Sequence, residues 1–183
     1  MTFVKKSGDL TPIVDNVFSI VTKAKQDKAK NGVENVIDAT IGSLYGEDEQ
    51  LVALDEVFTH YDAIDHKTKA AYASSFSGNP DYREAVWNWV KQDATIQLTH
   101  SVIATPGGSG AVSMSIETFL DAGETLILPD VAWGNYALMA SVNNIHVAKY
   151  SMFDGNHFNL ASVKETVKEV MKKQDHICMV IND

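Results

Sequence analysis

The amino-acid sequence predicts an α/β fold with a mostly parallel sheet and covering helices. From residue 101 onward, short apolar runs alternate with helical patterns. Strands that alternate with helices are joined by right-handed crossovers, which make neighbouring strands parallel. The 183 residues are 45% hydrophobic, which is enough to bury a core. The chain is therefore expected to form one ordinary domain or part of a larger one.

The first part of the chain predicts helices and one short strand. Residues 1–10 are expected to form an arm. Thr11 followed by Pro12 is typical of a helix start, and Asn31 followed by Gly32 is typical of a helix end. A short strand is expected over residues 35–39, and an amphipathic helix over residues 51–61.

Two loops and another helix follow the same rules. Residues 40–46 contain two glycines, and local composition favours a turn over a ligand contact there. Residues 69–78 are small and polar, which predicts a loop, and Asn79 with Pro80 begins the next helix.

Four strands and three helices are expected in the remainder. The helices are residues 108–120, residues 134–142 and one that Phe158 and Asn159 open; the strands are residues 101–105, 125–129, 145–151 and 176–181. The last strand is as apolar as a mid-sheet strand, and no helix follows to cover it. We therefore expect a truncated larger domain.

The stretch over residues 104–111 (Ala-Thr-Pro-Gly-Gly-Ser-Gly-Ala) predicts an anion-binding loop. Glycines let the backbone approach a phosphate, and the first N–H groups of a helix point at it. Ser109 adds a hydroxyl donor. A plain strand-to-helix turn explains the same glycines, and their spacing matches neither the dinucleotide fingerprint nor a P-loop.

Trp133 lies in the loop that follows the expected strand 125–129. Ligands of parallel sheets bind beyond the carboxyl ends of the strands. This loop leaves the sheet on the same side as the glycine loop, so the indole could lie flat on a planar ring held by its phosphate. A core tryptophan is the alternative interpretation.

Charge and cysteine content exclude several classes of protein. The 15 basic and 24 acidic side chains give a net charge of −9, which argues against a nucleic-acid partner. No apolar run reaches membrane-spanning length. Cys178 is the single cysteine and lies in an expected strand, so the sequence predicts no disulfide, no metal cluster and a cytoplasmic location.

Several stretches together resemble a known family. These are residues 105–111, 128–130 and 133–136, with Ile41-Gly42, Tyr72, Gly78 and residues 80–85 in support. They resemble the fold type I, class I/II aminotransferases that depend on pyridoxal phosphate, and the aspartate and aromatic branch most of all. The resemblance covers about residues 11–183, roughly the N-terminal half of such an enzyme.

The resemblance implies a fold and a reaction. The fold is a truncated large domain of the fold type I transferases, preceded by an N-terminal helical segment. Residues 1–45 would form the arm and part of the small domain, and residues 46–183 the first part of the cofactor-binding large domain. The activity would be amino-group transfer between an L-amino acid and a 2-oxo acid, with pyridoxal 5'-phosphate as cofactor, in a homodimer.

The resemblance also implies roles for individual residues. Gly107, Gly108 and Ser109 would hold the cofactor phosphate, and Trp133 would stack on its ring. Tyr72 would reach the phosphate bound by the other subunit.

Two further positions would lie near the substrate. The resemblance places Gly42 near the substrate carboxylate, and Tyr136 near the hydroxyl or nitrogen side of the cofactor ring.

The resemblance assigns no catalytic residue to this chain. The family's Asn-Pro-Thr-Gly motif would begin after Asp183, and the Schiff-base lysine would come later still. The lysines near the end of the chain instead resemble the solvated face of a helix: Lys164, Lys168, Lys172 and Lys173. The alternatives are another fold type I enzyme, such as a carbon–sulfur lyase or a decarboxylase, and a non-catalytic phosphate-binding fragment.

Overall fold

The computed structural model describes residues 16–48, 50–92 and 99–181. The chain divides into two compact units, Met1–Ala71 and Tyr72–Asp183, called here the N-terminal and the C-terminal unit. Each is described by itself. The boundary predicted after residue 45 stays a prediction.

The N-terminal unit consists of short helices. They are α1 (Asn16–Asn31), the 3-10 turn η2 (Val33–Asn35), α2 (Asp55–Ala63) and α3 (His66–Ala70). The predicted helix end at Asn31 is confirmed, because Gly32 follows with a φ of 88° that favours glycine. The predicted start at Thr11 and Pro12, and the arm before it, lie outside the described residues.

Two expectations for this unit are wrong. Residues 35–39 do not form a strand, since Asn35 belongs to η2 and the Ile37 side chain is 99% exposed. The helix expected from residue 51 begins only at Asp55, because Leu51 forms an isolated antiparallel bridge with Tyr45. Apolar spacing alone did not reveal that this bridge competes with the first helical turn.

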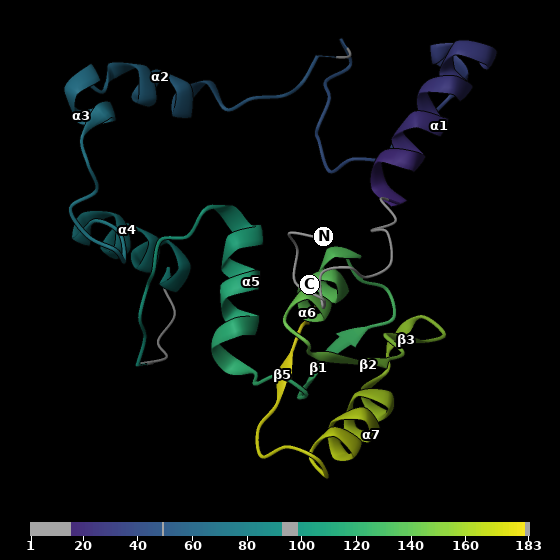
Figure 1. Ribbon diagram of the computed structural model, residues 1–183. Coiled ribbons are helices and arrows are strands. Elements are labelled where there is room, and N and C mark those ends of the chain that lie inside the picture. The colour runs from purple at the N-terminus through teal and green to yellow at the C-terminus, as the bar shows by residue number, and fades with distance from the viewer. Residues whose placement is uncertain (1–15, 49, 93–98, 182–183) are drawn as a thin grey trace, which may run out of the picture. The chain divides into compact units, whose positions relative to one another are not determined.

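The C-terminal unit contains the predicted α/β fold, which is confirmed (Figure 1). Its elements are α4 (Pro80–Lys91), α5 (Gly107–Phe119), β1 (Thr125–Pro129), α6 (Asn135–Val142), β2 (His146–Tyr150), β3 (Phe153–Asp154), β4 (His157–Phe158), α7 (Leu160–Val170) and β5 (Cys178–Met179). Within the described residues, one sheet has the order β2-β1-β5, and both of its pairings are parallel.

Strand β1 is the centre of the core. Leu126 pairs with Val147 on one side and Cys178 on the other, and all three pack in the cluster that α5 and α6 cover. Ile127, one residue on, packs with the opposite cluster, which α7 covers. Side chains alternate between the faces of a strand, so a fully apolar strand needs helices on both faces. The result is a three-layer α/β/α arrangement.

Two details of this unit differ from the sequence predictions. Residues 101–105 do not form a strand; the Ala104 N–H donates to the Ser77 carbonyl oxygen instead, at 2.9 Å. The strand expected over residues 176–181 is limited to β5. A strand needs a neighbour for its backbone groups, and an apolar run does not show whether one lies beside it.

A small hairpin was not predicted. Strands β3 and β4 pair antiparallel, and Gly155 turns the chain between them with a φ of 57°. The two-residue strands are too short to give a periodic pattern. None of the described helices has the length and apolar character needed to cross a membrane.

Gln174 holds the start of β1. Its side chain is 7% exposed, and its amide oxygen accepts from the Thr125 backbone N–H at 2.8 Å. Its amide nitrogen donates to the carbonyl oxygens of Thr125, at 3.2 Å, and His176, at 2.9 Å. Both backbone groups of Thr125 are thus satisfied by one side chain, as a neighbouring strand would satisfy them.

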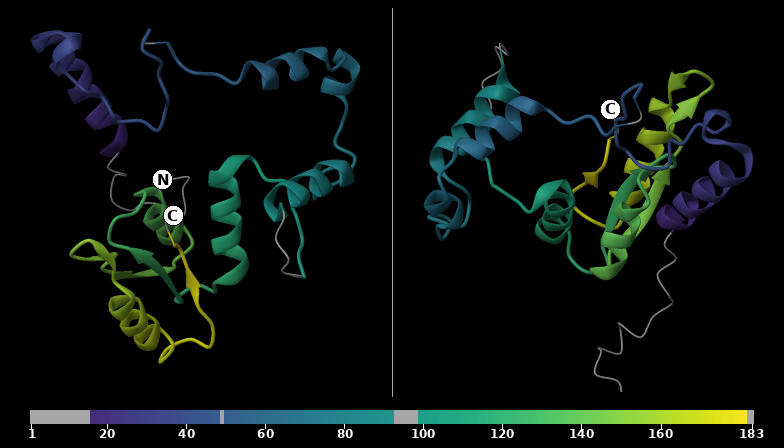
Figure 2. Two further views of the ribbon diagram at one scale, coloured as in Figure 1. Left: turned by 180° about the vertical axis from the view of Figure 1, so that it is seen from behind. Right: turned by 90° about the horizontal axis from the view of Figure 1, so that it is seen from above.

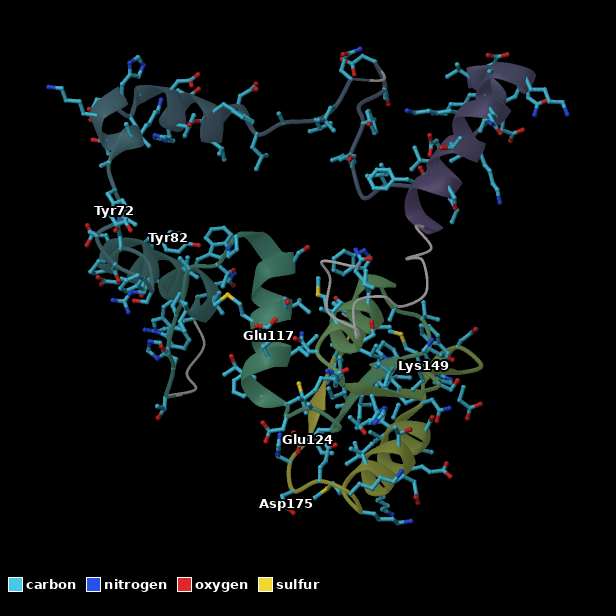
Figure 3. The ribbon with its side chains drawn as sticks, viewed as in Figure 1. Tyr72, Tyr82, Glu117, Glu124, Lys149 and Asp175 are labelled. Carbon is cyan, nitrogen blue, oxygen red and sulfur yellow. The ribbon has the colours of Figure 1, made fainter. Side chains whose placement is uncertain are left out.

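We expect Gln174→Ala to lower the free energy of unfolding by about 1–3 kcal/mol, because partly buried backbone groups lose their partners. The measurement is thermal or denaturant unfolding of the intact protein. Asp175→Ala is the matched control, since this neighbouring side chain is exposed (Figure 3). Equal stability of the two variants would show that Gln174 does not anchor β1.

Candidate functional site

The glycine loop has the conformation of an open helix start. Pro106 precedes α5, and Gly107 has a φ of 70°, which a residue with a Cβ rarely adopts. The Gly107 N–H donates to the Thr105 carbonyl oxygen at 2.8 Å, and the Thr105 hydroxyl donates to the Gly107 carbonyl oxygen at 3.1 Å. The loop is therefore closed on itself, and the next residues begin the helix.

The first turn of α5 presents free donors. Within the described part of the chain, no acceptor is found for the backbone N–H groups of Gly108 and Ser109. Both residues are exposed, and a Cβ built on Gly108 would meet nothing within 4 Å. Unpaired N–H groups and the helix dipole attract an anion. The arrangement can hold a phosphate or a carboxylate.

Gly110 leaves room for the ring of Pro106 at the start of α5. A Cβ at Gly110 would lie 2.7 Å from the Pro106 Cγ and 2.8 Å from its Cδ, so the proline ring packs directly on the glycine. Sequence reasoning gave Gly110 no separate role. A residue larger than glycine at position 110 would therefore push the Pro106 ring out of its place before α5.

Helices α5 and α6 bring the glycine loop to one end of the sheet. Only residues 120–124 join α5 to β1, so the helix runs back along the strand, and its first turn lies towards the carboxyl end of β1. Val112 of α5 and Tyr136 of α6 pack against the same core cluster. Figure 2 shows the two helices side by side, as their contacts require.

Trp133 lies in the loop between β1 and α6. Its ring meets that of Tyr136 edge to face, with centroids 5.4 Å apart and an interplanar angle of 87°. Its carbonyl oxygen accepts from the Tyr136 N–H at 3.1 Å. The side chain is 41% exposed, so it is not a core tryptophan. Part of the indole is available to a ligand at this end of the sheet.

Asp130 fixes the beginning of the same loop. Its Oδ1 atom accepts from the backbone N–H groups of Met152, at 2.9 Å, and Val131, at 3.0 Å. Its own N–H donates to the Tyr150 carbonyl oxygen at 2.9 Å. These donors, with the Met152 N–H first, hold the pKa of the Asp130 carboxyl below its ordinary value of 3.8.

The remaining predicted site residues are Tyr72 and Gly42. Tyr72 is 96% exposed and lies beside α4, away from α5 (Figure 3). Gly42 belongs to the N-terminal unit, in an exposed loop where a Cβ would meet nothing within 4 Å. The structure thus brings Trp133 and Tyr136 into contact, on the same helical layer as the glycine loop, and does not test the roles of Tyr72 and Gly42.

The contributions of Asp130 and Gly110 were missed in the sequence. An aspartate directly after a buried strand was a signal for the first, because a carboxylate there can accept the backbone N–H groups left free at strand ends. For Gly110 no sequence signal separates a glycine that relieves a clash from one that merely starts a helix.

Comparison with known proteins identifies the family. Residues 34–183 match the family described as "Aminotransferase class I and II". An aspartate aminotransferase of Pyrococcus horikoshii is 29% identical over 121 residues, which are 66% of this chain and 28% of that protein. A probable aspartate aminotransferase of Methanocaldococcus jannaschii is 26% identical over 121 residues, which are 66% of this chain and 29% of that protein.

Solved structures agree with this match. An aminotransferase from Anaerococcus prevotii superposes with a TM-score of 0.89 at 31% identity, over 100% of this chain and 45% of that one. A Thermus thermophilus aspartate aminotransferase variant superposes with a TM-score of 0.66 at 19% identity, over 91% of this chain and 42% of its own. The chain spans less than half the length of these relatives.

The chain belongs to the class I and II aminotransferases, the aspartate/aromatic-like family of pyridoxal-phosphate-dependent transaminases. The predicted family and fold class are confirmed, with the three-layer sheet as part of the aminotransferase fold. The family acts on an amino acid and a 2-oxo acid. The free N–H groups of Gly108 and Ser109 and the exposed indole of Trp133 fit a phosphate-bearing aromatic cofactor.

We expect Gly110→Ala to destabilise the protein by about 1–3 kcal/mol, because the new Cβ overlaps the Pro106 ring. Gly108→Ala is the matched control: its Cβ enters open space, and alanine favours a helix. The measurement is thermal unfolding of both variants. If Gly110→Ala melts with the wild type, Pro106 moves freely and the contact does not shape the loop.

Proposed function

We propose that the protein carrying this chain is a pyridoxal-phosphate-dependent aminotransferase that transfers an amino group between an L-amino acid and a 2-oxo acid. The observation that supports it most is the open first turn of α5, whose free N–H groups lie at the end of the sheet from which Trp133 also projects. Family membership supports the reaction class.

The residues of this chain would bind and orient the cofactor. Gly108 and Ser109 would hold the phosphate through their backbone N–H groups and the Ser109 hydroxyl. Gly107, whose own N–H donates to the Thr105 carbonyl oxygen, would contribute by letting the backbone come close to the phosphate. Trp133 would stack on the ring and fix its plane, and Tyr136 supports the indole at its edge. When bound, pyridoxal phosphate supplies an electron-poor ring that stabilises negative charge at the substrate carbon.

The remaining roles concern the whole protein. In a homodimer, Tyr72 would contribute to the phosphate site of the partner, for which a fully exposed side chain is available. Gly42 would lie near the substrate carboxylate, and Tyr136 near the hydroxyl or nitrogen side of the ring. The single cysteine fits a cytoplasmic location, where thiols stay reduced and disulfides are rare.

Product analysis separates the proposed reaction from the alternatives. An aminotransferase converts a 2-oxo acid into a new amino acid. A carbon–sulfur lyase would release pyruvate and a thiol, and a decarboxylase would release carbon dioxide. A non-catalytic phosphate-binding protein would give none of these products.

We expect Ser109→Ala to weaken pyridoxal phosphate binding by about 10- to 100-fold, since a hydrogen bond to a charged group is lost. Trp133→Leu should weaken it by about 3- to 10-fold, because apolar bulk remains but stacking does not. The measurement is an equilibrium titration of the intact protein with pyridoxal phosphate.

Trp89→Leu is the control for Trp133→Leu. Trp89 is 78% exposed on α4, outside the proposed site. Equal cofactor affinity in Trp133→Leu and Trp89→Leu would remove the stacking role, and wild-type affinity in Ser109→Ala would remove the hydroxyl from the phosphate site.

We expect the 183-residue chain alone to lack transaminase activity, because the resemblance places the Schiff-base lysine outside it. The assay follows amino-group transfer from L-amino acids to 2-oxo acids and compares the chain with free pyridoxal phosphate. Transfer above this protein-free rate would show that the chain holds its own catalytic lysine.

A further inference from the structure

The short loop that carries Trp133 is anchored at both ends. At its far end, the Trp133 carbonyl oxygen accepts from the Tyr136 N–H in the first turn of α6. At its near end is Asp130, the first residue after β1 and three residues before Trp133. The position of the indole therefore depends on where residues 130–134 leave the sheet.

Asp130 ties the loop to the neighbouring strand. Through its backbone N–H it continues the β1–β2 pairing by one residue, to Tyr150. Through Oδ1 it accepts at once from Val131, inside the loop, and from Met152, beyond the end of β2. One carboxylate oxygen thus joins the chain leaving β1 to the chain leaving β2.

The tie is suited to hold a loop in place. Backbone N–H groups at strand ends have no ladder partner, and a carboxylate accepts them more strongly than a neutral group does. Asp130 itself is exposed, so it contributes hydrogen bonds to the site rather than apolar packing.

We propose that Asp130 is a positioning residue that sets the place of the Trp133 ring, through its bridge between Val131 and Met152. The proposal rests on the proposed function, since the ring matters because it would stack on the cofactor. It adds a residue that acts through hydrogen bonds to the backbone.

Two substitutions separate the hydrogen bonds from other effects. Asp130→Ala removes the acceptor. Asp130→Asn keeps an oxygen of the same reach, so it should restore the bridge even without the charge. Asp154→Ala, at an exposed aspartate of β3, is the matched control for losing a surface carboxylate.

The first readout is fluorine NMR of the intact protein labelled with 5-fluorotryptophan and free of cofactor. The Trp133 resonance is assigned by its disappearance in Trp133→Phe. We expect it to shift or broaden in Asp130→Ala and to keep its wild-type position in Asp130→Asn and Asp154→Ala. The resonances of Trp87 and Trp89 should not move in any of them, which distinguishes local repositioning from general destabilisation.

The second readout is pyridoxal phosphate affinity. We expect Asp130→Ala to bind about 3- to 10-fold more weakly, as Trp133→Leu does, and Asp130→Asn to bind as the wild type does. An unmoved Trp133 resonance in Asp130→Ala overturns the proposal, and so does an equal shift in Asp130→Asn. Absence of cofactor binding in the wild type contradicts the proposed function instead, and the NMR result still decides the role of Asp130.

Discussion

The parallel pairing of β1 between β2 and β5 is the constraint on which the C-terminal unit depends. Every residue of β1 from Leu126 to Pro129 is buried. A strand that is apolar on both faces needs a covering helix on each face, and this requirement fixes where the helices pack. Leu126 and Leu128 require α5 and α6 on one face, and Ile127 requires α7 on the other. The three-layer arrangement follows from these few side chains.

The same strand decides where the glycine loop and Trp133 lie. Because α5 leads into β1 through a short turn and α6 follows β1 directly, both helices begin at the carboxyl end of the strand. Helix starts carry free N–H groups, and loops at this end are free to vary without disturbing the core. A glycine loop and an exposed tryptophan therefore come to one end of one sheet.

Polar side chains hold the strand ends where the ladder stops. Gln174 bonds both backbone groups of Thr125 at the start of β1, and Asp130 accepts two N–H groups just after its end. Each replaces backbone partners that a longer strand would have supplied. A short central strand thus keeps a fixed length, and the loop that carries Trp133 leaves it at a defined point.

The sequence by itself determined the helices α4 to α7, the strands β1 and β2, and the family, because periodicity, helix starts and the glycine and tryptophan motifs are local signals. Only the tertiary structure decided that residues 101–105 bond to Ser77 instead of joining the sheet, and that Leu51 pairs with Tyr45. It also revealed the Pro106 contact of Gly110 and the bridge made by Asp130. These contacts depend on which groups the folded chain brings close together, and the spacing of residues along the sequence does not predict that.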